Sequence, residues 1–470
     1  MFRVFQHRSS GTQFLELFAD GLLCFIAVML SAATLSETHA ASLSAAAQWI
    51  TPPLLTIALA FSLVMALLYS FVGLYRHANL AFVSLFLRVG FAFVVGGYLT
   101  YLATKYIRYE GYASQLIAYS MLYLVAGLAL YRGAAWAWRQ AVGTRRVLIV
   151  GTGPDAQQVW SDMQVRDQWQ GYQVVGFVPT AETGLVEAAG NGVKVFARER
   201  RLAELVREHK VNEIIVAVRE QRGGGVPMDQ LLDCRIQGVP ILDFAGFCER
   251  TKAEVPVDSL KASWLVYGDG FMQGRARALT KRVFDIVSSG TLLVLASPVM
   301  LLAALAIRLD SRGPIIYRQE RVGLGGETFM CMKFRSMRTD AEKDGVARWA
   351  SKNDSRITRV GAFMRKTRID ELPQLLSVLR GEMSMVGPRP ERPTFVSQLR
   401  EAIPFYDLRH TVKPGLTGWA QVRFSYGASM EDARRKHQFD LYYVKNNSLV
   451  LDLLVLIETV SVVLFREGAH

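Results

Sequence analysis

Long uncharged apolar stretches, separated by charged segments, fill the first third of the chain. Four of them run over about 14–33, 54–74, 80–103 and 114–131. Each is near the roughly 20 residues that an α-helix needs to cross a bilayer core. Basic residues lie before the first and after the fourth, whereas 34–53 contains no Lys or Arg. By the positive-inside rule, both ends of this bundle face the cytoplasm. We predict a four-helix transmembrane bundle over residues 1–142.

The pattern then changes to short runs rich in β-branched residues, which alternate with helical patterns. Arg145–Val159 predicts a buried strand, a glycine turn and the start of a helix. Further strands are predicted at Tyr172–Val178, Gly192–Phe196, Val211–Val218 and Val239–Phe244, and a helix at Arg200–His209. This alternation predicts a Rossmann-like α/β domain with a doubly wound parallel sheet over residues 143–252.

The glycine turn of this domain matches a dinucleotide fingerprint only in part. Gly151 and Gly153 are in place, but Ala156 replaces the third glycine, and no acidic residue ends the second strand. An incomplete fingerprint is a weak signal. Two interpretations stay open: a structural or regulatory domain, which we favour, and a domain that binds NAD(P).

A connector over 253–274 leads to a last segment, 275–470, which begins with a second kind of apolar stretch. Between Asp285 and Arg308 no residue is charged, yet basic residues flank both sides. Ser297 and Pro298 stand in the middle, where proline removes a helix hydrogen bond. We predict a re-entrant helix over 283–309 that breaks at Ser297–Pro298 and returns to the cytoplasmic face. The alternative is a plain fifth span.

The predicted fold class is therefore a membrane α-helical bundle, an α/β Rossmann-like domain and a mainly α, membrane-associated catalytic domain with a re-entrant helix hairpin. The chain is 51% hydrophobic with a net charge of +13, and residues 276–470 hold 30 Lys and Arg against 20 Asp and Glu. A basic domain suits an anionic membrane surface or phosphorylated substrates. We expect no nucleic-acid partner, because no recognition fold is legible. The four scattered cysteines provide neither a disulfide framework nor metal spacing.

Two adjacent acids, Asp370 and Glu371, are the candidate catalytic residues. On a helix, neighbours point about 100° apart, which suits two separate roles. Either Thr367 and Asp370 form a capping box or Asp370 is itself the N-cap, with Pro373 in the first turn. The positive end of the helix dipole would then keep the acids ionised and attract phosphate. The alternative is a solvated helix-capping pair.

Several motifs surround these acids in a fixed order: FMCMKFRSMRTDAE, KNDSRITRVGAFMRKTRIDELPQ, MSMVGPRPERP, RHTVKPGLTGWAQV and FDLYYVKNNSLVLDL. Together they resemble the bacterial sugar transferase family, the polyprenyl-phosphate hexose-1-phosphate transferases, over about 276–465. The bundle and the Rossmann-like domain resemble the large form of that family. The wording around WAQVRFSYGAS is similar to undecaprenyl-phosphate glucose phosphotransferases of exopolysaccharide systems.

The resemblance implies that a hexose-1-phosphate, glucose or galactose, passes from a UDP-sugar to undecaprenyl phosphate with release of UMP. It implies Asp370 as nucleophile, through an aspartyl-phosphosugar intermediate, and Glu371 as Mg²⁺ ligand, although these two roles can be exchanged. It also implies a bacterial inner (cytoplasmic) membrane enzyme in contact with membrane lipid, with its catalytic domain on the cytoplasmic face. A homodimer is the implied assembly, and no interface pattern in the sequence indicates it.

Basic residues near the acids are the candidate ligands of substrate phosphates. They are Lys333, Arg335, Arg356, Arg365, Arg368 and Arg389. Arg389 is our first choice, because two prolines hold it and guanidinium groups bind phosphate in a bidentate manner. Asp440 matches an Asp position of the family, and the resemblance implies that it supports the site.

Two rival functions remain to be weighed. A membrane-anchored nucleotide-sugar dehydratase or epimerase would need an intact glycine fingerprint and a Tyr-x-x-x-Lys pair. Tyr172 is the only tyrosine in 145–244, and Gly176 stands where that Lys would be. A non-catalytic, nucleotide-sensing scaffold would not need Asp370 and Glu371.

Overall fold

The structure of the protein is a computed structural model. It describes residues 11–39, 51–71, 82–107, 112–142, 144–165, 172–180, 194–218, 226–260, 270–271, 274–339, 356–424 and 429–465. The chain forms two compact units, Met1–Thr251 and Lys252–His470.

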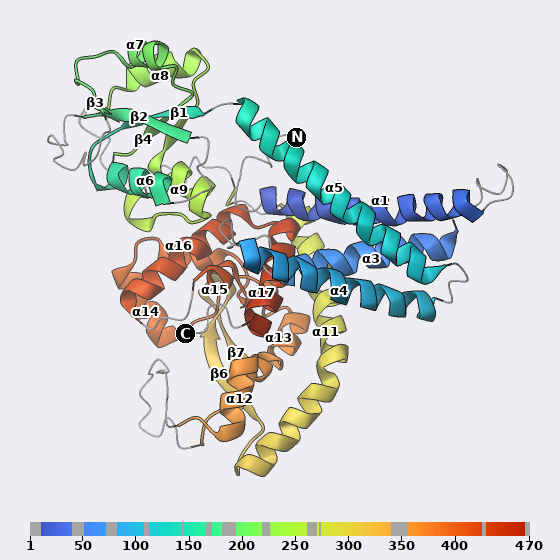
Figure 1. The fold of residues 1–470 in the computed structure, drawn as a ribbon. Coiled ribbons are helices and arrows are strands. Elements are labelled where there is room, and N and C mark those ends of the chain that lie inside the picture. The colour runs from blue at the N-terminus through green and yellow to red at the C-terminus, as the bar shows by residue number, and fades with distance from the viewer. Residues whose placement is uncertain are drawn as a thin grey trace. The chain divides into compact units, whose positions relative to one another are not determined.

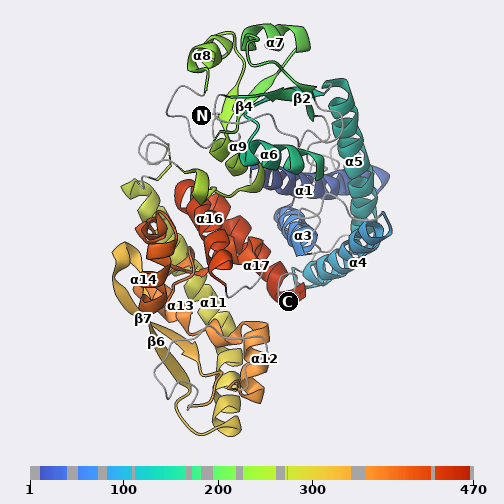
Figure 2. The same cartoon turned by 90° about the vertical axis from the view of Figure 1, so that its left-hand side faces the viewer.

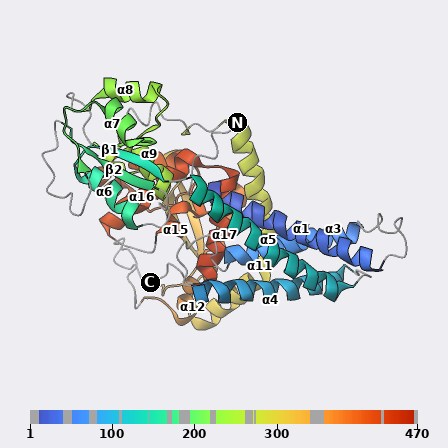
Figure 3. The ribbon, with the colours of Figure 1, turned by 45° about the horizontal axis from the view of Figure 1, so that its top comes forward.

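The first unit begins with four long helices that pack side by side (Figure 3). They are α1 (Gly11–His39), α3 (Pro52–Phe71), α4 (Phe82–Tyr106) and α5 (Ala113–Val142). Phe61 and Met65 of α3 and Leu124 of α5 are among the buried side chains of their common core. Many leucines on the outer faces are exposed, as expected for helices that face lipid rather than water.

Among the described residues, four helices are long and apolar enough to cross a membrane: α1, α3, α5 and α11 (Arg275–Asp310). The first three coincide with predicted spans. The remaining predicted span, 80–103, forms α4, which is not one of these four candidates.

A parallel sheet follows the bundle, with the strand order β3-β2-β1-β4-β5 (Figure 1). Its strands are β1 (Arg145–Val150), β2 (Tyr172–Val178), β3 (Lys194–Val195), β4 (Glu213–Val216) and β5 (Ile241–Asp243). Its helices are α6 (Pro154–Val165), α7 (Leu202–His209), α8 (Met228–Ile236) and α9 (Phe244–Lys252). The doubly wound parallel sheet expected from the sequence is confirmed.

Apolar side chains cover the sheet on both faces (Figure 2). On one face Leu148 and Ile214 pack against α7 and α8, for example against Leu205. On the other face Ile149 packs with Phe247 of α9 and with α6. Strands that are buried on both faces explain the continuous apolar runs of the sequence.

The first glycine of the β1–α6 turn has a structural reason. Gly151 has φ +118°, and a Cβ there would lie 2.4 Å from the carbonyl oxygen of Ala217. Only glycine accommodates both the backbone conformation and this close approach. Ala156, at the position of the third glycine, is fully buried in the core.

The second unit surrounds one large core with short strands and helices. The strands are β6 (Ile316–Val322) and β7 (Thr328–Phe334), which form an antiparallel hairpin, and β8 (Ser384–Val386) and β9 (Gly415–Thr417), which pair in parallel. The α-helices after α11 are α12 (Arg359–Thr367), α13 (Gln374–Arg380), α14 (Pro393–Ala402), α15 (Trp419–Arg423), α16 (Met430–Asn446) and α17 (Leu449–Phe465). The 3-10 turns are η3 (Val257–Ser259), η4 (Leu324–Gly326), η5 (Ile369–Glu371) and η6 (Tyr406–Thr411).

Residues 253–260, from the predicted connector, lie in this core. Ala253 and Val255 are buried. The indole Nε1 of Trp419 donates to the Ala253 carbonyl at 2.8 Å, and the Val255 amide donates to the Gln438 carbonyl at 3.0 Å. These contacts make the segment part of the second unit.

α11 is one continuous helix of 36 residues with Pro298 inside it. Leu295, Leu301 and Leu302 are each at least two-thirds exposed, and 11% of the helix is buried. An apolar helix without a protein cover requires a lipid environment. The helix continues through Ser297 and Pro298, so the re-entrant change of direction stays a prediction.

Candidate active site

The acids Asp370 and Glu371, here called the dyad, lie in the short 3-10 turn η5 between two helices. α12 ends at Arg368, which adopts the left-handed conformation (φ 58°, ψ 14°). α13 begins only at Gln374. Both acids are buried, with 6% and 7% of their surface exposed. The chain reversal at Arg368 therefore turns two adjacent carboxylates into the protein.

The predicted helix cap is wrong in its details. Thr367 does not form a capping box with Asp370, because its hydroxyl donates backwards to the Phe363 carbonyl at 2.9 Å. Thr367 thus belongs to the end of α12, and Pro373 occupies the N-cap position of α13. The solvated capping pair is also excluded, since both carboxylates are buried.

Three cations surround the Glu371 carboxylate. Lys333 Nζ lies 2.9 Å and Arg389 Nη2 2.8 Å from Oε1. Arg368 Nη1 lies 3.5 Å from Oε2. Although burial opposes ionisation, Arg389 and Lys333 hold the pKa of Glu371 well below its usual range. Glu371 is therefore ionised at neutral pH and organises three of the predicted phosphate ligands.

The second carboxyl group has a different environment. Burial and the negative charge of Glu371 raise the pKa of Asp370 to about 6. Its Oδ1 atom is buried and has no hydrogen-bond partner among the described residues. Arg365 lowers this pKa by its charge, and its own Nη1 is likewise buried without a hydrogen-bond partner in the described parts of the chain. Two unsatisfied groups of opposite charge thus flank the dyad.

The GPRP turn (Gly387–Pro390), which carries Arg389, is fixed through its main chain. The Gly387 amide donates to the Thr417 carbonyl at 2.9 Å, and the Gly415 amide donates to the Pro388 carbonyl at 2.9 Å. A Cβ on Gly387 would lie 2.3 Å from a neighbouring main-chain oxygen, so this position requires glycine. The turn presents the Arg389 side chain to Glu371 from a rigid support.

Arg409 holds the same turn from behind. Its Nη2 donates to the Arg389 carbonyl at 2.8 Å and to Asp440 Oδ2 at 2.9 Å, and its Nη1 donates to the Tyr406 hydroxyl at 2.8 Å. Arg409 and Asp440 are almost fully buried. Asp440 therefore reaches the site through Arg409, as a positioning residue. The sequence gave no reason to single out Arg409, although it lies in the quoted RHTVKPG motif.

The remaining predicted ligands contact main-chain groups. Arg335 is buried and donates to the carbonyls of Ser311 and Arg312 at 2.8 and 2.5 Å, which closes the end of α11. The Arg356 carbonyl accepts a hydrogen bond from the Arg338 amide, next to the start of α12. Arg335 thus has a structural role at the membrane helix.

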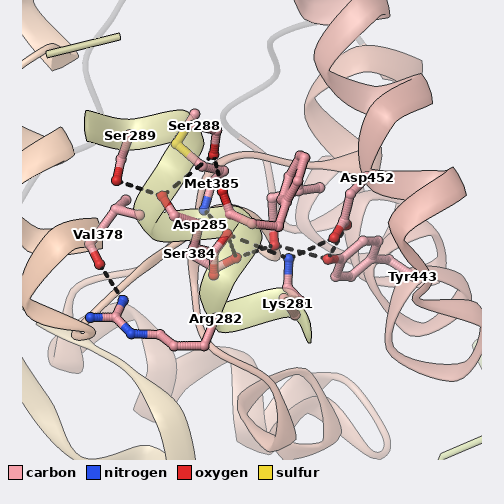
Figure 4. Close-up of polar contacts among 12 residues, drawn as sticks. Lys281, Arg282, Asp285, Ser288, Ser289, Val378, Ser384, Met385, Tyr443 and Asp452 are labelled. Carbon is pink, nitrogen blue, oxygen red and sulfur yellow. Dashed lines mark hydrogen bonds and ion pairs between the residues drawn. The ribbon is translucent and has the colours of Figure 1, made fainter. Parts of the chain in front are cut away.

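A polar network ties the other end of α11 to the strand that precedes the GPRP turn (Figure 4). Asp285 Oδ1 accepts hydrogen bonds from the Ser384 hydroxyl at 2.9 Å and from the Met385 amide at 3.0 Å. Lys281 donates to Asp452 at 2.8 Å, and the Tyr443 hydroxyl contacts the same carboxylate at 2.7 Å. Membrane helix and catalytic unit are therefore one connected structure.

Two buried histidines beside Arg409 predict an acid-sensitive fold. Burial and the charge of Arg409 lower the pKa of His437 to about 3 and that of His410 to about 4. The unfolded chain takes up these protons below pH 6.5 and the folded protein does not. Stability is therefore lost as the pH falls from 6.5 toward 3, by up to about 1.4 kcal/mol per pH unit for each histidine.

Thermal unfolding of the detergent-solubilised protein between pH 7 and pH 4 measures this effect. His437→Phe keeps a ring against Tyr406, which lies 5.0 Å from His437 between ring centroids. The variant is expected to lose less stability than the wild type over this range. Identical pH profiles would contradict the assignment.

Comparison with known proteins places this site in a family. The family model described as bacterial sugar transferase matches residues 276–466. A relative from Escherichia coli K12, UDP-glucose:undecaprenyl-phosphate glucose-1-phosphate transferase, is 35% identical over 72% of this chain and 72% of its own length. The chain belongs to the bacterial sugar transferase family.

Further relatives of this transferase agree with that assignment. The glucose-1-phosphate transferase of Xanthomonas campestris is 33% identical over 74% of this chain and 72% of its own. UDP-N-acetylgalactosamine-undecaprenyl-phosphate N-acetylgalactosaminephosphotransferase of Aeromonas hydrophila is 42% identical over 51% of this chain and 56% of its own. A second family model, described as CoA-binding domain, matches residues 70–224.

Proposed function

We propose that the protein transfers a hexose-1-phosphate from a UDP-sugar to undecaprenyl phosphate and releases UMP, as the first membrane step of exopolysaccharide synthesis. The buried dyad surrounded by Lys333, Arg368 and Arg389 carries the proposal. Carboxylates beside clustered cations suit phosphoryl transfer, in which the protein positions the groups and neutralises charge. The names of the relatives support the two substrates.

The unsatisfied Oδ1 of Asp370 is the proposed nucleophile. Its attack on the sugar-bearing phosphorus forms an acyl-phosphate bond and breaks the bond to UMP, which leaves. A phosphate oxygen of undecaprenyl phosphate then attacks the same phosphorus, forms the lipid diphosphate and frees Asp370. Arg389 and Lys333 stabilise the charge that develops on the phosphoryl oxygens.

The residues present fit a Mg²⁺ ion. Mg²⁺ in proteins is usually bound by one or two carboxylates together with substrate phosphates and water. The unsatisfied Asp370 oxygen and the ionised Glu371 provide such a pair of carboxylates. We propose Glu371 as the principal ligand, and the ion would neutralise the diphosphate of the substrate.

The contacts of α11 support the re-entrant topology. Near its start, Arg282 donates to the Val378 and Leu379 carbonyls at 2.7 and 2.6 Å. At its end, Arg335 holds Ser311 and Arg312. Because both ends bind the same basic unit, we propose that both lie on the cytoplasmic face of the inner membrane. Cysteines introduced at Arg275 and Arg312 are expected to be labelled from the cytoplasmic side alone.

Release of UMP tests the proposed function. The purified full-length protein, with Mg²⁺, undecaprenyl phosphate and labelled UDP-sugars, is expected to release UMP with UDP-glucose or UDP-galactose. UDP-N-acetylgalactosamine belongs in the same panel because of the Aeromonas relative. Absence of UMP with every common UDP-hexose would overturn the assignment. Sizing of the detergent-solubilised protein tests the implied homodimer.

A further inference from the structure

Arg368 occupies a backbone conformation that favours glycine. It ends α12 with φ 58° and ψ 14°, in the left-handed region. At this position after a helix, glycine is the preferred residue, because a Cβ is unfavourable there. A residue kept in an unfavourable conformation next to a catalytic dyad suggests that its side chain has a function.

The two oxygens of Glu371 divide the surrounding cations into two sets. Lys333 and Arg389 both contact Oε1. Arg368 approaches Oε2, at 3.5 Å, and 42% of its side chain is exposed. Arg368 therefore stands on the other side of the carboxylate and is open to an arriving ligand.

These sets also come from different parts of the unit. Lys333 lies on β7, and Arg389 lies in the turn held by Arg409 and Asp440. Arg368 and Arg365 lie at the end of α12, which is part of the α11 side of the unit.

α12 packs directly on the membrane helix. Met364 of α12 shares a buried cluster with Ala303 and Ile307 of α11. The neighbouring Phe363 is 61% exposed, and Leu309 of α11 is 79% exposed. Exposed apolar side chains on both helices place the end of α12 where lipid begins. A phosphate carried by a lipid would reach the dyad from this side.

We propose that Arg368, together with Arg365, binds the phosphate of the polyprenyl substrate, whereas Lys333 and Arg389 bind the phosphates of the nucleotide sugar. The inference rests on the proposed function. Arg365 supports it, because its buried Nη1 has no hydrogen-bond partner among the described residues and would gain one from the phosphate.

Arg368→Gly tests this division, because glycine removes the guanidinium and suits the backbone. We expect the KM for undecaprenyl phosphate to rise about tenfold or more, as for the loss of a charge-assisted hydrogen bond. The KM for the UDP-sugar should stay within about twofold, and the melting temperature should be unchanged or higher. Lys210→Gly is the matched control, since Lys210 ends α7 in the same conformation (φ 51°, ψ 50°). It should change neither KM.

A second pair of variants separates the side chain from the backbone. Arg368→Asn also tolerates the left-handed region and should reproduce the selective rise in KM. Arg368→Lys should restore part of the affinity for the lipid. A rise in the KM for the UDP-sugar, or no change in either KM, would overturn the proposed division while the function stands. A wild-type protein that releases no UMP in this assay would overturn the function and this inference with it.

Discussion

Asp370→Asn is expected to abolish turnover, with a fall in kcat of at least about 10³-fold. The amide lacks the anionic oxygen that attacks phosphorus, and it nearly preserves the shape of the buried side chain. No sugar-phosphate adduct should form on the variant. UMP release from a labelled UDP-sugar measures the first effect, and intact-protein mass spectrometry after incubation with the UDP-sugar alone measures the second.

Asp258→Asn is the control for this change. Asp258 is 46% exposed and pairs with Arg434 on the surface of the same unit, so its loss should leave kcat almost unchanged. If Asp370→Asn retained wild-type turnover, Asp370 would be removed from the mechanism and the aspartyl intermediate with it.

Glu371→Gln is the second change with a large expected effect. It removes the negative charge that faces Lys333, Arg368 and Arg389. Three cations would then repel one another beside the diphosphate site, and the proposed Mg²⁺ ligand would be lost. We expect kcat to fall about 10²- to 10³-fold, and the Mg²⁺ concentration for half-maximal rate to rise at least about tenfold. Steady-state UMP release over a Mg²⁺ titration measures both.

Two further variants make this result specific. Glu371→Asp retains the charge on a shorter side chain and should recover part of the rate. Glu401→Gln changes an exposed residue of α14 and should have no effect on the Mg²⁺ titration. An unchanged Mg²⁺ requirement in Glu371→Gln would show that the ion is held elsewhere.

The regular elements followed from local patterns. β2 has the predicted bounds, Tyr172–Val178, and α7 starts two residues after the predicted Arg200. Periodicity reports which side of a segment is buried, and that is decided within a few residues. The dyad was also recognisable, because its two acids are adjacent in a dense set of motifs.

The roles of the basic residues did not follow from local patterns. Arg335 stands two residues from Lys333, yet it binds carbonyls at the end of α11 instead of the dyad. Arg409, which the sequence did not single out, supports Arg389 from 20 residues away. Each side chain could reach several partners, and its neighbours in space decide which one it binds.

The sequence by itself determined three things: the apolar segments, the parallel α/β sheet and the acids of the transferase site. These depend on residue type and spacing, which act over short stretches of chain. The tertiary structure alone decided that Glu371 is ionised while burial raises the pKa of Asp370, and that Arg368 faces the opposite side of the dyad from Arg389. Burial, charge and contact are properties of groups brought together from distant segments, so only the folded chain specifies them.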